Sequence, residues 1–285
     1  MIPPLSSTTT SQASPDLLLE HIAHAHNPDA EAHRIPWYFQ GHLVGSISDT
    51  WRELATHHLG HKLDATSLSQ VHALCQSIRL QVSQWMDEPF GLYIPSQITP
   101  IGQVPRGAVS HLGLQAYGVH ANGFVRKADG IHMWVAKRSM NKPTFPGQWD
   151  NMVGGGLTAG FTPDQVLAKE TDEEAGLQLE QMLNVEPVGI LNYQHSHAGG
   201  LRNDRLVIYD LELPEGLTPH PKDGEVERFE CWPLDQLRQV VSRTREFKYN
   251  CNLVIMEFLL RHSALDDHPD KEAIAEALNE RFQPT

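Results

Sequence analysis

The chain has 285 residues, a length typical of about two domains, and 40% of them are apolar, which is enough for a sizeable core. Its 22 basic and 35 acidic residues give a net charge of −13, which argues against non-specific binding to nucleic acid or to an anionic membrane surface. No apolar run reaches the roughly 18 residues of a membrane span, and three widely spaced cysteines are typical of buried thiols in a reducing cytoplasm.

The first third of the chain is predicted to be a tail followed by a small domain. Residues 1–15 are rich in Ser, Thr and Pro, which favours a disordered tail. Residues 16–108 are predicted to form a small α/β domain. Its expected elements are helices at residues 17–25, 49–58 and 67–86 and one or two strands within residues 37–46. A linker rich in proline and glycine, from Pro95 to Gly107, is expected to end this domain.

Residues 109–285 are predicted to form a second domain. Alternating apolar residues on both sides of Asp129-Gly130 predict a β-hairpin. Strands are expected at residues 188–193, 206–213 and 226–232, and helices at residues 163–175, 234–241, 250–262 and 272–282. This order predicts an α/β (α+β) fold in which helices pack around a mixed sheet.

The helix at residues 163–175 has clear end signals. Thr162, Pro163 and Gln165 form a capping box with proline at the first helical position. Gly176 follows the last helical residue and is suited to the left-handed conformation that ends many helices. We therefore expect about three and a half turns between these residues.

This helix carries three glutamates, Glu170, Glu173 and Glu174, within an arc of about 100 degrees beside its apolar face. Like charges at this spacing disfavour a helix by about 0.2 to 0.5 kcal/mol per pair, and a bound divalent cation would reverse the sign. Oxygen donors without His or Cys favour Mg²⁺ or Mn²⁺. A solvated acidic helix face is the alternative interpretation.

The stretch from Gly155 to Leu177 resembles the Nudix box, a motif of fixed spacing that begins with a glycine. Six positions match the motif: Gly155, Glu170, Glu173, Glu174, Gly176 and Leu177. Three positions depart from it, because Phe161 stands where the first glutamate is expected, Lys169 replaces an arginine and Thr171 replaces an aliphatic residue. The resemblance implies a metal held mainly by the three glutamates, whereas the missing first glutamate usually supports the helix.

Four further runs resemble the Nudix group related to thiamin pyrophosphokinase. They are residues 118–124, 134–139, 142–151 and 223–227. The resemblance implies a Nudix α/β/α sandwich preceded by an additional N-terminal domain. It also implies hydrolysis of thiamin diphosphate, or of its oxidised or damaged analogues, to a monophosphate and phosphate.

The expected reaction is the attack of water on a diphosphate bound with Mg²⁺ or Mn²⁺. Glu170 and Glu174 are the first candidate metal ligands, Glu173 is a third ligand or the general base, and Glu225 is a rival base or an extra ligand. A backbone carbonyl of Gly155 or Gly156 is a further metal ligand. The candidate substrate-binding residues are Arg138, Lys142, Asn122, Gln148, Asp150 and Asn151. Trp149 suits the core as well as stacking on a substrate ring.

Two other functions remain open. The first is hydrolysis of another diphosphate, such as ADP-ribose, NADH or a nucleotide sugar, and the second is a non-catalytic Nudix binding module, which Phe161 favours. Among the 17 histidines, only His195 and His197, expected in a loop, are candidates to border the substrate pocket. The expected partner is a small-molecule diphosphate, with no nucleic acid and no membrane, and the protein is expected to be a monomer or homodimer.

Overall fold

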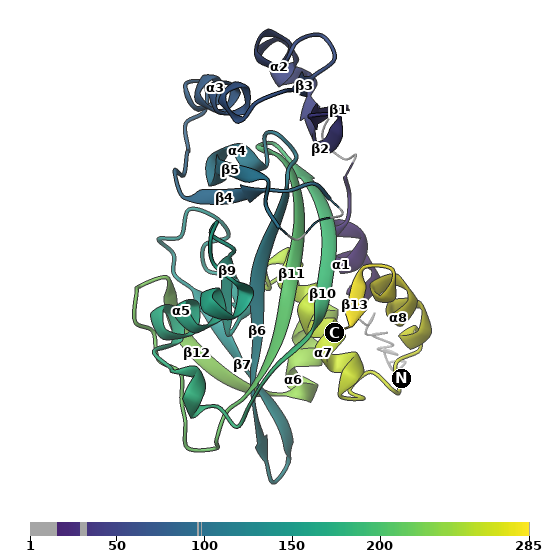
Figure 1. The fold of residues 1–285 in the computed structure, drawn as a ribbon. Helices are drawn as coiled ribbons and strands as arrows, with labels where there is room; N and C mark the ends of the chain where they lie inside the picture. Colours follow the sequence, from purple (N-terminus) through teal and green to yellow (C-terminus); the bar gives the residue numbers. More distant parts are fainter. Residues whose placement is uncertain (1–15, 29–32, 96, 98, 285) are drawn as a thin grey trace, which may run out of the picture.

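The computed structural model describes residues 16–28, 33–95, 97 and 99–284 (Figure 1). The predicted tail at residues 1–15 lies outside this described part of the chain. Within it, no helix is both long enough and apolar enough to cross a membrane.

The N-terminal part has its own small sheet and its own core. Strands β1 (Arg34–Phe39), β2 (His42–Ser48) and β3 (Asp64–Ala65) pair in the order β2-β1-β3. The helical elements η1 (Asp49–Trp51), α2 (Arg52–Leu59) and α3 (Leu68–Arg79) pack against this sheet. Figure 1 places these elements at one end of the molecule. They are additional to the larger sheet described below, and the separate domain expected at residues 16–108 stays a prediction.

Two predictions in this region were wrong in detail. The helix expected at residues 67–86 ends at Arg79; Val82 and Trp85 still pack on the same core, although their backbone is not helical. The expected linker contains part of a hairpin of β4 (Pro89–Leu92) and β5 (Gly102–Pro105), followed by α4 (Arg106–Val109). Apolar spacing therefore predicted burial correctly here, but not the backbone conformation.

A large mixed sheet forms the second part of the molecule. Its strands are β6 (Gln115–Lys127), β7 (Gly130–Arg138), β10 (Asn184–His197), β11 (Gly200–Glu212), β12 (Val226–Pro233) and β13 (Phe282–Pro284). They pair in the order β12-β7-β6-β11-β10-β13, and β6 and β11 are the parallel neighbours. The short strands β8 (Trp149–Asn151) and β9 (Val153–Gly156) add to β7 and β6.

Helices cover both faces of this sheet, which gives the predicted α/β/α sandwich. Helix α5 (Pro163–Ala175) packs on one face through Val166 and Leu167. Helices α6 (Leu234–Arg243) and α7 (Tyr249–Arg261) pack on the other face, where Phe258 lies against Phe124. The 3-10 helix η2 (Leu179–Gln181) follows α5, and α8 (Lys271–Asn279) precedes β13.

Helix α1 (Leu18–Ala25) packs far from its sequence neighbours. Leu18, Ile22 and Ala25 share the apolar cluster of α7 and α8 rather than that of the N-terminal sheet. Asn27, just after this helix, forms a bridge with His195 on β10. The domain division at about residue 108 stays a prediction, and the packing groups α1 with the second unit.

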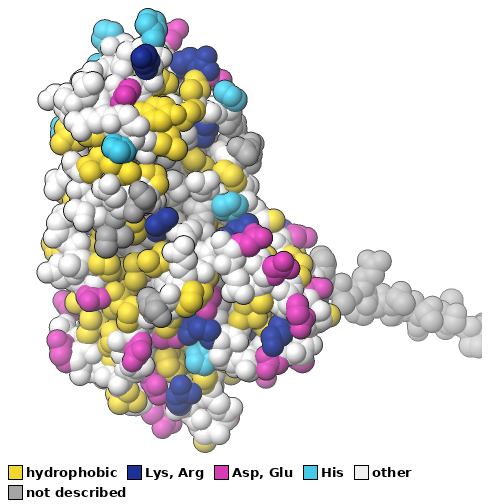
Figure 2. Space-filling view, turned by 45° about the vertical axis from the view of Figure 1, so that its right-hand side comes forward, with side chains coloured by type: hydrophobic (Ala, Val, Ile, Leu, Met, Phe, Trp, Pro, Cys, Tyr) yellow, Lys and Arg dark blue, Asp and Glu magenta, His cyan; other side chains and the backbone are white. Residues whose placement is uncertain are grey.

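The surface matches the acidic composition. Figure 2 shows acidic side chains gathered over the lower part of one face, whereas Lys and Arg side chains are scattered over that face without forming a continuous field. A phosphate ligand must therefore be bound by local features of a site.

Candidate functional site

The sequence signals for the two ends of α5 are confirmed. The Thr162 hydroxyl accepts a hydrogen bond from the Gln165 backbone N–H at 3.3 Å, and Gln165 Oε1 accepts one from the Thr162 N–H at 2.9 Å. Gly176 ends the helix with a φ of +65°. These caps fix where the helix begins and ends, and with it the direction in which its glutamates point.

Glu174 is the buried acid of this helix, with 8% of its surface exposed. Its Oε2 accepts a hydrogen bond from the backbone N–H of Gly154 on β9 at 3.0 Å. Burial, together with the charges of Asp150 and Glu170, raises the pKa of Glu174 well above its ordinary value. A carboxylate in this position stays ionised more easily when a cation is near.

Glu170 lies one turn before Glu174 and packs directly on the backbone of β9. A Cβ at Gly155 would lie 2.5 Å from Glu170 Cγ, so the close approach requires glycine there. Burial is also the main cause that raises the pKa of Glu170. Lys169 Nζ contacts Glu170 at 3.2 Å and Glu173 at 2.7 Å, and the Glu173 side chain is 48% exposed.

These two desolvated carboxylates fit a divalent cation. The charge of Glu170 adds to the rise in the pKa of Glu174, and the charges of Glu173 and Glu225 add to the rise in the pKa of Glu170. A cation beside these acids would offset both the repulsion and the burial penalty. The donors are oxygens, as Mg²⁺ and Mn²⁺ prefer. The Gly155 carbonyl oxygen faces β6, since a Cβ at Gly118 would lie 2.9 Å from it, so its part as a ligand stays a prediction.

A small cavity of about 10 Å³ lies beside Glu174. It brings together several residues singled out from the sequence: Arg138, Lys142, Asp150, Asn151, Glu174 and Glu225. A cavity needs roughly 10 to 15 Å³ to hold one water molecule. This cavity therefore has room for about one water or one metal ion, and a phosphate group would need the lining side chains to move.

The two basic residues of the cavity already have protein partners. Arg138 donates to the carbonyl oxygens of Thr144 and Phe145 at 2.8 and 3.0 Å, and to Asp150 at 2.8 Å. Lys142 forms an ion pair with Glu225. Arg138 thus anchors the loop before β8, whereas the Lys142–Glu225 pair joins two surface loops at the cavity.

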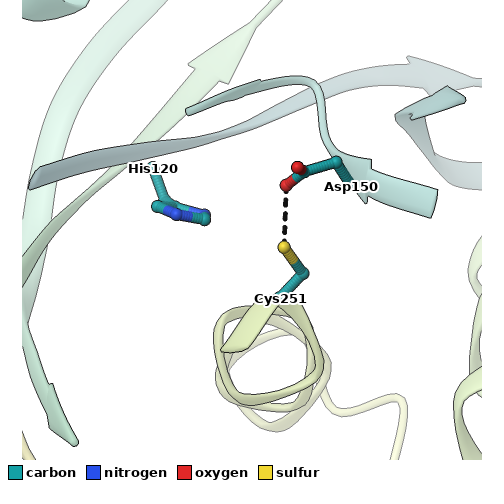
Figure 3. A group of neighbouring side chains, drawn as sticks. All are labelled: His120, Asp150 and Cys251. Carbon is teal, nitrogen blue, oxygen red and sulfur yellow. Dashed lines mark hydrogen bonds between the residues drawn. The ribbon is translucent and has the colours of Figure 1, made fainter. Parts of the chain in front are cut away.

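Asp150 is the centre of a buried polar cluster that sequence reasoning did not assemble (Figure 3). Cys251 Sγ lies 2.7 Å from Asp150 Oδ1, and Lys248 Nζ lies 3.8 Å from Asp150 Oδ2. Burial alone would raise the pKa of Asp150, but the positive charges of Lys248 and Arg138 hold it below its ordinary value. Burial lowers the pKa of His120 to about 4.

His120, Asp150 and Cys251 have donor atoms close enough to one another for a metal ion. However, Arg138 and Lys248 already neutralise Asp150, and an added cation would face both positive charges. His120 Nδ1 lies 2.8 Å from Asn151 Oδ1, so it donates its proton there. The cluster is therefore better described as a hydrogen-bond network than as a metal centre.

Two of the candidate substrate-binding residues lie outside the cavity lining. Asn122 is fully buried; it donates to Asp210 at 3.1 Å and accepts from Asn151 at 3.0 Å. Gln148 contributes its backbone to the loop that Arg138 holds. Their substrate contacts stay predictions, and their visible roles are structural.

Two other sequence expectations are resolved by the packing. Trp149 is 5% exposed and packs on Trp232, which places it in the core. His195 and His197 lie at the end of β10 rather than in a loop, because the hairpin with β11 extends to Gly200. The His195 ring stacks on Tyr249, on the sheet face opposite α5.

His120, Lys248 and Cys251 were missed because they are far apart in the chain. One signal was available: Asn250 and Asn252 flank Cys251 in a helix that is mostly apolar and buried. Polar groups on such a helix need partners inside the protein, and Asp150 is one of them.

Comparison with known proteins gives a consistent family. The family profile described as NUDIX domain matches residues 116–251. Nudix hydrolase orf19 of Rhodococcus erythropolis is 31% identical over 149 residues, which cover 47% of this chain and 80% of that protein. Two chloroplastic proteins of Arabidopsis thaliana, Nudix hydrolase 20 and Nudix hydrolase 24, are 41% and 38% identical over 55% and 57% of this chain.

The chain spans only 42% and 44% of the length of these two plant relatives. Among solved structures, the NUDIX domain of Shewanella oneidensis NrtR complexed with ADP ribose covers 52% of this chain and 88% of that one, with 18% identity and a TM-score of 0.42. That likeness is too distant to add to the assignment.

Proposed function

Because the chain belongs to the Nudix hydrolase family, we propose that it hydrolyses a phosphoanhydride bond of a small-molecule diphosphate with Mg²⁺ or Mn²⁺. The main support is the desolvated pair Glu170 and Glu174 beside a glycine strand and a small polar cavity. An acid whose pKa is raised at the wall of a cavity is typical of a functional site, and Glu174 is such an acid, with Glu170 one helical turn away.

Glu170 and Glu174 would hold the ion, with Glu173 or the Gly155 carbonyl as further ligands. Glu173 is less favoured, since it is half-exposed and bonded to Lys169. When bound, the ion supplies shielding of phosphate oxygens and a lowered pKa of the attacking water.

Lys142 is the better placed of the two basic residues to bind a phosphate. Its partner Glu225 is exposed, whereas the Lys142 side chain is only 19% exposed. The carboxylate can therefore move into water, and a phosphate can take its place beside the lysine. Glu225 would then be free to take a proton from water, as would Glu173 in the alternative assignment. Arg138, fully engaged by three acceptors, keeps the cavity wall in place.

Two substrate classes are candidates. Nucleoside diphosphate derivatives such as ADP-ribose, NADH or a nucleotide sugar are one candidate set. Thiamin diphosphate and its oxidised or damaged analogues are the other, supported by the four sequence runs described above. The cytoplasmic location and the monomeric or homodimeric state remain part of this proposal, although the plant relatives are named chloroplastic.

The test is a diphosphate panel in Mg²⁺ and ¹⁸O-water with mass-spectrometric product analysis, which identifies the substrate and the phosphorus attacked. Glu174→Gln should reduce turnover by about 100-fold, the scale of a lost metal ligand. Glu272→Gln, an exposed acid on α8, is the matched control and should keep full turnover. Ligand binding without hydrolysis would instead identify a binding module.

A further inference from the structure

The acid site is built from two elements that a short loop connects. Strand β9 supplies the backbone of Gly154 and Gly155, and α5 supplies Glu170 and Glu174. Residues 157–162 join the end of β9 to the start of α5. The position of this loop therefore sets how the two halves of the site meet.

The N-terminal part of the chain holds this loop through β4 and the residue before it. The Thr158 hydroxyl donates to Glu88 Oε1 at 2.5 Å, and the Ala159 N–H donates to the Pro89 carbonyl at 2.8 Å. Thr158 also forms a bridge with Phe90. In addition, a Cβ at Gly156 would lie 2.6 Å from Phe90 Cζ, so the ring packs on the end of β9.

Glu88 is itself fixed by Arg106. Arg106 NH1 donates to Glu88 Oε2 at 2.8 Å, and the Arg106 backbone N–H donates to the Glu88 carbonyl at 2.8 Å. The same guanidinium lies 5.2 Å from the centre of the Phe90 ring. By contrast, the Phe161 side chain, next to the helix cap, is 48% exposed. The start of the loop is thus held by a segment more than 60 residues earlier, whereas its end, at Thr162, is held by the helix cap.

We propose that Glu88 and Thr158 form a positioning contact through which the N-terminal unit sets the metal affinity of the acid site. The proposal rests on the proposed function for its site, but it concerns ion binding rather than turnover. Glu88 touches neither ion nor substrate; it acts by holding residues 157–162 so that Glu170 and Glu174 face Gly154 and Gly155.

The test measures Mn²⁺ binding to the full chain by paramagnetic resonance, together with the Mg²⁺ dependence of any hydrolysis. Thr158→Val and Glu88→Ala should each weaken ion binding about tenfold, as expected when a group that orients metal ligands is lost. The double variant should be no weaker than either single one, because both act through one contact. Thr158→Ser keeps the hydroxyl and should restore binding.

Asp87→Asn is the matched control, since Asp87 is adjacent to Glu88 but bonds Arg79 and Trp85 instead. It should bind Mn²⁺ as the unchanged protein does. Melting midpoints separate the two effects: lower midpoints with unchanged ion affinity would overturn the proposal, and so would additive losses in the double variant. A chain that hydrolyses no diphosphate, yet loses Mn²⁺ affinity in these variants, would overturn the proposed function and leave this inference standing.

Discussion

Two pairs of buried carboxylates in this protein have opposite surroundings. Asp150 contacts Arg138 and Lys248, and Asp210 contacts Arg261 at 2.6 Å. Burial alone would raise the pKa of both aspartates, but these partners lower it.

Glu170 and Glu174 are also desolvated, yet their pKa values are raised. Glu170 adds negative charge to the surroundings of Glu174, and Glu173 and Glu225 do the same for Glu170. Within the described part of the chain, only Glu170 of this pair contacts a cationic side chain, the half-exposed Lys169. Burial therefore does not by itself mark a functional acid. Asp150 and Asp210, which have cationic side chains as partners, stabilise the fold. Glu170 and Glu174, which have too little positive charge around them, are suited to bind a cation.

The largest effect on stability should come from Asp210, one of the two aspartates with cationic partners. Asp210→Asn removes the charge of a buried carboxylate that pairs with Arg261 and accepts from Asn122, and it leaves Arg261 with Glu257 alone. It should lower the free energy of unfolding by about 3 kcal/mol, as measured by urea denaturation. Glu212→Gln, two residues along β11, loses only a solvated pair with Arg126 and should cost less than about 1 kcal/mol. Equal losses would remove the distinction between these pairs.

The second effect concerns pH. The pKa of Asp150 is lowered in the folded state, so its contribution to stability is complete above the unfolded value near 3.9 and is lost as the pH falls further. Asp150→Asn should therefore cost about 2 kcal/mol at pH 7. The difference should shrink below pH 4 in unfolding curves of the two proteins; a constant difference would contradict the charge pairing.

The third effect has the opposite sign. The pKa of Glu174 is raised, so its ionised form destabilises the fold increasingly as the pH rises above the unfolded value near 4.3. Without metal at pH 7, Glu174→Gln should raise the free energy of unfolding by about 1 kcal/mol, with no gain below pH 4.

Mg²⁺ at ten times its dissociation constant should stabilise the unchanged protein by about 1.4 kcal/mol and the variant by much less. Thermal melting with and without Mg²⁺ measures both changes. If Glu174→Gln instead destabilises the metal-free protein, the negative charge of Glu174 is already balanced by groups of the protein, and the prediction is wrong.

The smallest effect should be that of Glu173→Gln, which removes an exposed pair with Lys169 and should change stability by less than about 1 kcal/mol. Its effect on Mg²⁺ dependence is more informative than its effect on stability. A tenfold loss of Mg²⁺ affinity would make Glu173 a ligand, and a lower turnover at unchanged affinity would make it the base.

Local signals in the sequence predicted the acid helix well. Thr162, Gln165 and Gly176 carry cap chemistry that depends only on near neighbours, and the structure confirms it. The hairpin turn at Asp129-Gly130 is confirmed for the same reason. Whether Glu170, Glu173 and Glu174 bind metal stays a prediction.

Contacts between segments that are far apart in the chain could not be predicted from such local signals. The strands β4 and β5 lie in a region rich in proline and glycine, where composition favours a linker. The sequence predicts Asp150 as a substrate-binding residue, but it does not predict the contacts of Asp150 with Lys248 and Cys251, which lie about 100 residues further along the chain. The spacing of apolar residues within one segment carries no information about a contact with a distant segment.

The packing of α1 against α7 has a consequence for synthesis of the protein. Leu18 and Ile22 have partners on α7 at residues 249–261, more than 220 residues later. At about 5 to 20 residues per second, a ribosome needs on the order of 10 to 50 s to make the intervening chain. The N-terminal sheet can fold during that interval, while α1 must wait until α7 has been made, so α1 precedes this sheet in the chain but reaches its native place after it.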